Sequence, residues 1–184
     1  ASSTNSNYGK FNLVSNPYPS YLKGNSRLDN TNNFLTINGS TNDNLHNSYA
    51  SIFVYDGDGN ISAKTNANTT NEDVYIAPGQ GFFIAADESA KIVFTEDMQT
   101  VSGTDDFNGE NSNMQSHEVR LKLFNGDNMI EKTEIFFIEG LTNGLDVTWD
   151  SGNFNADAAL MTRLIEGDEG YGIAVNAMGL DAME

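Results

Sequence analysis

Hydrophobic positions along this chain recur with the two-residue period of β-strands. Val119, Leu121 and Leu123 alternate with charged residues, which predicts a strand with one buried and one solvated face. An Asn-Gly-Asp-Asn turn sequence follows. The apolar run within residues 133–139 then predicts a strand that is buried on both faces. We therefore expect a β-hairpin over residues 118–139, with its second strand inside a sandwich.

Further short apolar segments carry the same signature, and clusters of Gly, Asn, Asp or Pro separate most of them. No segment keeps the i, i+3, i+4, i+7 spacing of an amphipathic helix over three turns. Short apolar segments separated by turn-forming residues predict an all-β fold, a β-sandwich or jelly roll of about 8–11 short antiparallel strands. The additional expected strands are residues 11–14, 34–37, 52–55, 74–76, 81–85, 91–95, 147–149, 160–164 and 172–175.

The chain shows no clean linker and no internal repeat. We therefore expect residues 10–184 to form a single β-sandwich domain, and residues 1–9 to be a disordered or artificially added N-terminus. Two polar stretches, residues 20–33 and 96–115, are predicted to be long loops.

Charge narrows the possible partners. The sequence has 26 acidic and nine basic residues and a formal net charge of −17, and its cations are scattered. Such a surface repels nucleic acid and anionic lipid, so neither nucleic-acid binding nor membrane insertion is expected. Apolar runs of about 18 residues, which a transmembrane helix needs, are absent from the sequence. Cysteine is absent too, which excludes disulfides and thiolate metal sites.

Three segments carry a family resemblance. Residues 11–20 read F-N-L-V-S-N-P-Y-P-S and resemble the W-N-L-V-G-N-P-Y-P-S segment of many secreted Bacteroidetes proteins. Residues 76–84 resemble their I-A-P-G-Q-G-F-F-V segment, and residues 144–150 are similar to their G-F-D-x-x-x-D segment. Over roughly residues 10–178 the chain thus resembles the non-catalytic, β-rich region that precedes the type IX secretion sorting domain in such adhesins and polysaccharide-degrading enzymes.

The resemblance implies an extracellular or cell-surface location, with polysaccharide and neighbouring domains of a longer chain as partners. Phe11 stands where the family has Trp, and Ser15 where it has Gly. The family supplies no catalytic residues to carry over. The motif prolines, Pro17 and Pro19, also favour a structural role, because they fix φ and restrict the residues before them.

Two acidic groups are candidates for a structural Ca²⁺ ion. Asp56, Asp58 and Asn60 place oxygen ligands at alternate positions of a tight turn. Asp146 and Asp150 form the second group, where like charges favour a bridging cation. Each group has a structural alternative, which is a hairpin turn for the first and Asx-type capping for the second.

Aromatic side chains with polar handles suit the apolar C–H faces of sugars. Trp149 has core packing as its alternative. A polyanionic glycan would also need a local cluster of cations. The predicted ligand-binding residues are Tyr18, Tyr21, Tyr49, Trp149, Lys23 and Arg27.

Short catalytic signatures are absent: the sequence has no H-E-x-x-H, G-x-S-x-G, P-loop or G-x-G-x-x-G. The leading hypothesis is a non-catalytic, extracellular carbohydrate-binding module that targets a larger secreted protein to polysaccharide. A neutral glycan fits the net charge best. The alternatives are a structural spacer or adhesin domain of a cell-surface protein, and a polysaccharide lyase or glycosidase.

Overall fold

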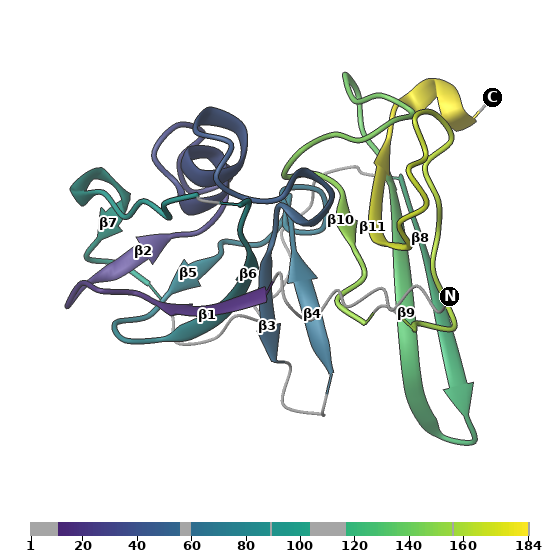
Figure 1. Ribbon diagram of the computed structural model, residues 1–184, viewed down its shortest axis with the longest axis horizontal. Coiled ribbons are helices and arrows are strands. Elements are labelled where there is room, and N and C mark those ends of the chain that lie inside the picture. The colour runs from purple at the N-terminus through teal and green to yellow at the C-terminus, as the bar shows by residue number, and fades with distance from the viewer. Residues whose placement is uncertain (1–10, 56–59, 89, 104–116, 156, 184) are drawn as a thin grey trace.

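The computed structural model describes residues 11–55, 60–88, 90–103, 117–155 and 157–183. Within this part of the chain, eleven strands form three sheets and the helical segments are short (Figure 1). The prediction of an all-β fold is confirmed. None of the helices in the described residues has the length and apolar character required to cross a bilayer.

The middle layer is an antiparallel sheet with the strand order β1-β6-β3-β4. Both faces of this sheet contribute to apolar clusters, because successive side chains of a strand point to opposite sides. Phe82 joins one apolar cluster, whereas Phe83 packs against the other. The strands are β1 (Phe11–Ser15), β3 (Ile52–Tyr55), β4 (Ile61–Lys64) and β6 (Gly81–Ala85).

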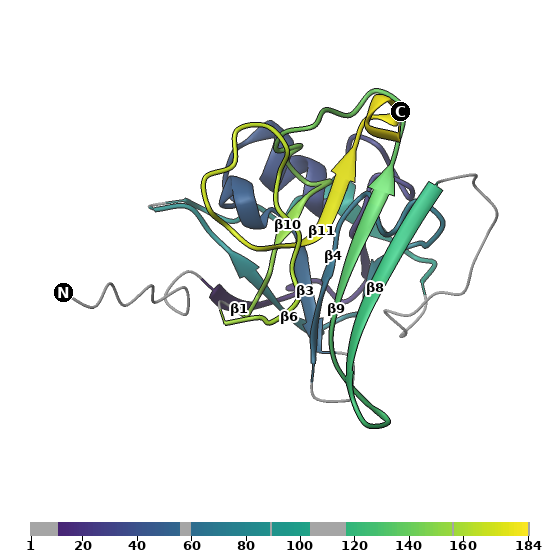
Figure 2. The ribbon, with the colours of Figure 1, turned by 90° about the vertical axis from the view of Figure 1, so that its right-hand side faces the viewer.

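A second four-stranded sheet, with the order β10-β11-β9-β8, covers one of these faces. Phe53 and Ala63 of the first sheet share a buried cluster with Phe136 and Val175 of the second. Figure 2 shows the second sheet in front of the first. Pairing is antiparallel except between β9 and β11, which run parallel. The strands are β8 (His117–Asn125), β9 (Asn128–Phe137), β10 (Ser151–Gly152) and β11 (Ile173–Met178).

The opposite face of the middle sheet packs against a three-stranded sheet, with the order β5-β2-β7, and against short helical segments. The apolar cluster on this face has fully buried members from the third sheet and the helical segments, including Leu22, Phe34, Ile76 and Met98. The finer expectation of a sandwich or jelly roll is not confirmed by these strand orders. The elements are β2 (Tyr21–Lys23), β5 (Tyr75–Ile76), β7 (Gln99–Thr100), a π-helix (Thr36–Thr41) and 3₁₀ helices (Asn47–Tyr49, Glu96–Met98, Leu180–Met183).

The predicted hairpin is confirmed as β8–β9, but the prediction of a buried face on β8 is wrong. Val119 and Leu121 are 43% and 45% exposed. Glu118 is the register partner of the core residue Phe136, so the even-numbered positions of β8 face the middle sheet. The apolar positions therefore point to the outer side of the last strand in the sheet.

Several other expected strands are wrong as well. Residues 34–37 form the start of a helical segment rather than a strand. Asn33 stabilises it, because its side chain accepts a hydrogen bond from the Thr36 N–H at 2.8 Å and donates to Asp29 O at 2.6 Å. Residues 91–95 and 147–149 contain no strand, and residues 160–164 contribute only a bridge at Thr162. The expectation for residues 1–9 lies outside the described residues.

Asn16 joins two of the segments that carry the family resemblance. Its buried amide donates to Ser20 O, Ile76 O and Ala77 O at 2.8, 3.0 and 3.2 Å, and its carbonyl oxygen accepts from the Tyr18 N–H. Strand β1 also pairs with β6, so the start of the first motif segment lies beside the end of the second. The first motif segment therefore links the middle sheet to the β2–β5 layer. This agrees with the structural role that Pro17 and Pro19 favour.

Candidate functional site

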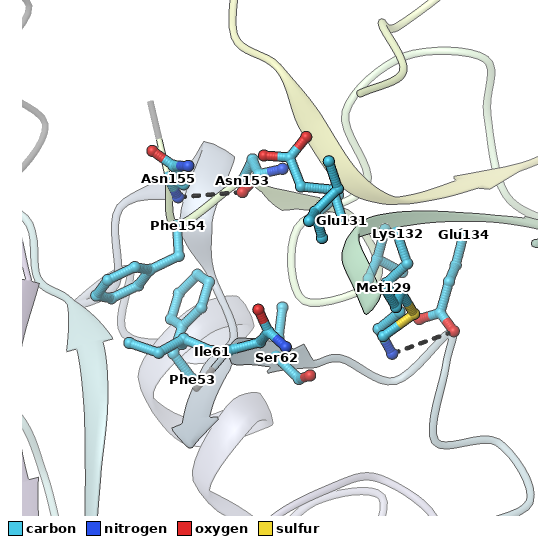
Figure 3. A pocket seen from close by; sticks show the side chains of 15 residues that line it. Phe53, Ile61, Ser62, Met129, Glu131, Lys132, Glu134, Asn153, Phe154 and Asn155 are labelled. Carbon is cyan, nitrogen blue, oxygen red and sulfur yellow. Dashed lines mark hydrogen bonds and ion pairs between the residues drawn. The ribbon is translucent and has the colours of Figure 1, made fainter. Parts of the chain in front are cut away.

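The main candidate site is a pocket between the middle sheet and the second sheet, which we call the inter-sheet pocket (Figure 3). Its volume of about 330 Å³ lies at the lower end of the range for small-molecule sites, roughly 300–1,000 Å³. The pocket is open to solvent on one side. Strands β3 and β4 form one wall, and β9, β11 and the segment after β10 form the others.

One side of the inter-sheet pocket is apolar. Phe53 is buried and holds Phe154 at a ring-centroid distance of 5.5 Å, and Phe154 also packs on Phe11 at 4.2 Å. Figure 3 shows the rings of Phe53 and Phe154 beside Ile61, across the pocket from the charged side chains. Because Phe154 is locked among other rings, it offers a preorganised half-buried face.

The charged side is organised around Glu134, which is 5% exposed. Its Oε1 lies 3.3 Å from Arg120 Nε and 3.6 Å from Lys132 Nζ, and its Oε2 accepts a hydrogen bond from Asn68 Nδ2 at 3.2 Å. A buried carboxylate requires such partners, because desolvation without them is costly. Glu134 is therefore an anchored group that positions Lys132 at the pocket wall.

Glu131 and two asparagines bring further polar groups to the pocket. Glu131 Oε2 accepts a hydrogen bond from the Leu160 N–H at 2.7 Å, which ties β9 to the segment after β10. Asn153 Oδ1 accepts from the Asn155 N–H at 3.0 Å in an Asx-type turn that presents Phe154 between the two amides. Amides and a carboxylate thus border an aromatic ring, an arrangement that suits a ligand with both hydroxyl groups and apolar faces.

Four of the predicted ligand-binding residues lie elsewhere, on the side of the third sheet. Tyr18 packs against the cluster there and donates its hydroxyl to Phe94 O at 3.1 Å. Tyr21 stacks edge-on against a second tyrosine. Lys23 pairs with Asp29 at 2.6 Å, and Arg27 pairs with Asp73 at 2.7 Å. Ion pairs occupy both cations, so they form no open cationic cluster.

The other two predicted ligand-binding residues, Tyr49 and Trp149, belong to the cluster between the two four-stranded sheets. Tyr49 is 2% exposed and so offers no sugar platform. Trp149 is half-buried and packs against the same cluster. Neither side chain lines the inter-sheet pocket. The structure therefore does not bring the six predicted residues together.

The second predicted metal group forms a network of hydrogen bonds to the backbone. Asp150 is fully buried, and its two oxygens accept from the Ala177 N–H and the Asp146 N–H, each at 2.6 Å. Burial raises the pKa of Asp150 to about 7, although those two N–H groups oppose the shift. Asp146 in turn accepts from the Thr142 N–H and hydroxyl. This is the capping arrangement that was the structural alternative, and it fastens the turn to β11.

Asp56 and Asp58 of the first predicted metal group lie outside the described residues. Asn60, the third member, lines the inter-sheet pocket. Across the residues that the structure does describe, no group of three or more acidic or histidine side chains is arranged to hold a metal ion. The Ca²⁺ site at residues 56–60 stays a prediction.

The sequence carried one usable signal for the inter-sheet pocket, which is the triplet Asn153-Phe154-Asn155. An aromatic residue between two amides has the polar handles that sugar recognition requires. The other walls come from β4 and β9, which are far from this triplet along the chain. Because a single short triplet is common in an Asn-rich chain, it could be recognised only after the fold was known.

Comparison with known proteins places the chain in a family without assigning it an activity. No curated protein and no solved structure matches the chain. A family model described as "Domain of unknown function (DUF8693)" matches residues 1–181, which is nearly the whole sequence. The chain therefore belongs to the DUF8693 family.

Proposed function

We propose that this domain is a non-catalytic, extracellular carbohydrate-binding module, and that the inter-sheet pocket is its glycan site. The observation that carries the proposal is the combination of an apolar wall and polar groups in one pocket. Phe154 and Ile61 offer surfaces for the C–H faces of a sugar, while Asn153 and Glu131 border them with hydrogen-bonding groups. The binding residues are thus different from the tyrosines that the sequence favoured.

The charge of the protein favours a neutral glycan as ligand. With a net charge of −17, the surface repels sulfated or uronic polymers. Within the pocket, Lys132 is paired with Glu134 and is not a free anion receptor. Glu131 lines the pocket and uses Oε2 to accept from the Leu160 N–H, which leaves further acceptor capacity on its carboxylate. It is therefore suited to accept a hydrogen bond from a sugar hydroxyl.

Two carboxylates in one pocket are also the feature that a glycosidase needs. Here, however, Glu134 is ion-paired with two cations and accepts a hydrogen bond from an amide, which is the environment of a structural ion pair. Both oxygens of the Glu134 carboxylate already have partners on the protein, and this supports binding without catalysis.

The family-like segments support a role outside the cell. They resemble regions next to the type IX sorting domain, and on this basis we propose a secreted or cell-surface location with neighbouring domains in a longer chain. The module would then bring those domains to polysaccharide. A spacer role predicts the same location but no affinity for glycans.

The experiment is a retention assay on gels that contain neutral polysaccharides, with and without Ca²⁺. Ile130 lines the pocket and is 46% exposed, so Ile130→Arg fills the pocket without disturbing the core. We expect this variant to lose at least about tenfold in affinity. The matched control is Leu13→Arg on β1, where the side chain is 66% exposed and does not line the pocket. It should bind like the wild type.

Two results would contradict the proposal. One is no retention on any polysaccharide, and the other is equal retention by the wild type and the Ile130→Arg variant. Release of reducing ends from the polymer by the wild type would favour the glycosidase alternative instead. Circular dichroism spectra of both variants check that each one is folded.

A further inference from the structure

We propose that β8 pairs antiparallel with β8 of a second copy of this chain, forming a twofold-symmetric dimer with one continuous sheet. This inference is independent of glycan binding. In its sheet β8 is the last strand, and no other described strand pairs with its outer edge. An edge strand presents unpaired backbone N–H and C=O groups, which are a template for a further strand.

The side chains of β8 leave this edge unprotected on its outer face. Val119 and Leu121 are 43% and 45% exposed, and both lie on the face turned away from the middle sheet. The strand is also long, with nine residues from His117 to Asn125. A long, exposed edge with a row of apolar side chains is the arrangement that folded proteins usually avoid unless it is paired.

The charge pattern of β8 selects a second copy as the partner. In a twofold-symmetric antiparallel pair centred on Arg120, Glu118 lies opposite Lys122 of the other copy, and by symmetry this contact occurs twice. The same register sets Val119 opposite Leu121, again twice. Opposite charges and apolar pairs directly across strands both stabilise a sheet. The strand is therefore complementary to itself in one register.

Lys122 has no oppositely charged partner among the described residues of the single chain. Its register partner on β9 is Lys132, which carries the same charge, and Lys122 forms no ion pair with any described residue. Like charges directly across strands are destabilising. In the dimer a carboxylate would lie on the other side of Lys122. Arg120 meets its own symmetry mate, but it is already paired with Glu118 at 3.0 Å and Glu134 at 3.3 Å.

The distribution of charge over the chain also favours this edge. The whole sequence carries −17, whereas β8 carries two cations and one carboxylate. Surfaces with an excess of carboxylates repel each other over a screening length of about 8 Å at physiological salt. Strand β8 itself has no such excess.

Sedimentation equilibrium at protein concentrations of about 1 to 500 μM tests the proposal. The wild type is expected to show a monomer–dimer equilibrium. Lys122→Glu turns two attractive contacts into two repulsive ones and should weaken the dimer at least about tenfold. The exchange variant Glu118→Lys/Lys122→Glu restores opposite charges across the interface at an unchanged net charge, and it should restore the dimer.

The control is Lys91→Glu, which makes the same change in net charge at an exposed position away from β8. It should leave the dissociation constant within about threefold of the wild type. A wild type that stays monomeric throughout this concentration range would overturn the proposal. So would a dimer that Lys122→Glu does not weaken, because its interface would lie elsewhere.

Discussion

The buried carboxyl of Asp150 gives a sharp prediction about the pH dependence of stability. Its pKa is raised to about 7 in the folded protein, first by burial and then by the nearby charge of Asp146. In the unfolded chain it returns to about 3.9. Between these values the folded state binds more protons than the unfolded state, so the free energy of unfolding falls as pH rises.

The size of the effect follows from these two pKa values. A shift of one pKa unit corresponds to about 1.4 kcal/mol. Raising the pH from 5 to 7.5 should therefore lower the contribution of Asp150 to the free energy of unfolding by about 2.5 kcal/mol. Asp150→Asn keeps the shape of the side chain but cannot titrate. The difference in stability between wild type and variant should fall by this amount over the same pH range.

Urea unfolding followed by tryptophan fluorescence measures this difference at several pH values. The control is Asp29→Asn. The pKa of Asp29 is held well below its usual range by the N–H of Asn32, then by Lys23 and the N–H of Thr31. The stabilising contribution of Asp29 is lost only at pH values below about 4. The difference in unfolding free energy between the wild type and Asp29→Asn should therefore stay constant between pH 5 and 7.5. A flat difference for Asp150→Asn as well would refute the reasoning.

Three further predictions concern stability. Gly39→Ala should destabilise the fold by about 1–3 kcal/mol in urea unfolding, because the new Cβ would clash with Thr148 Cγ2. An unchanged midpoint would contradict this packing. Asn25→Ala should cost about 2–4 kcal/mol by the same assay, since this buried amide donates to three acceptors around residues 69–72, and a loss below about 0.5 kcal/mol would argue against the network. If residues 56–60 bind Ca²⁺, the melting temperature should rise when Ca²⁺ is added and fall when it is chelated. The double variant Asp56→Asn/Asp58→Asn should abolish the rise. An identical rise in the variant would place the ion elsewhere.

The alternation of apolar residues and the turn sequence predicted the hairpin of β8 and β9, because its strands and its turn all lie within some twenty consecutive residues. The same patterns could not say which face of β8 would be covered. Alternation marks one face as apolar, but burial depends on whether another layer reaches it, and β8 is the last strand of its sheet. The parallel pairing of β11 with β9 also escaped prediction, because it joins segments far apart in the sequence.

Residues 34–37 show a different limit of sequence reasoning. A short apolar run fits a buried helical turn as well as it fits a strand. Asn33 decides the outcome through side-chain hydrogen bonds that stabilise the helical start. The inter-sheet pocket shows a related limit, since the sequence identifies aromatic side chains with polar handles but does not show which strands meet to form a pocket. The Asn-Phe-Asn triplet at residues 153–155 is present in the sequence, but it could be recognised as part of the pocket only once the fold was known.

The most direct test of the proposed function is a two-dimensional ¹H–¹⁵N NMR titration of the wild type with the neutral oligosaccharide that the gels retain most strongly. The account predicts that shifts concentrate on backbone amides around the inter-sheet pocket, at Ser62, Glu131, Asn153 and Asn155. Shifts confined to the surface of the third sheet around Tyr21, with the pocket amides unmoved, would contradict it.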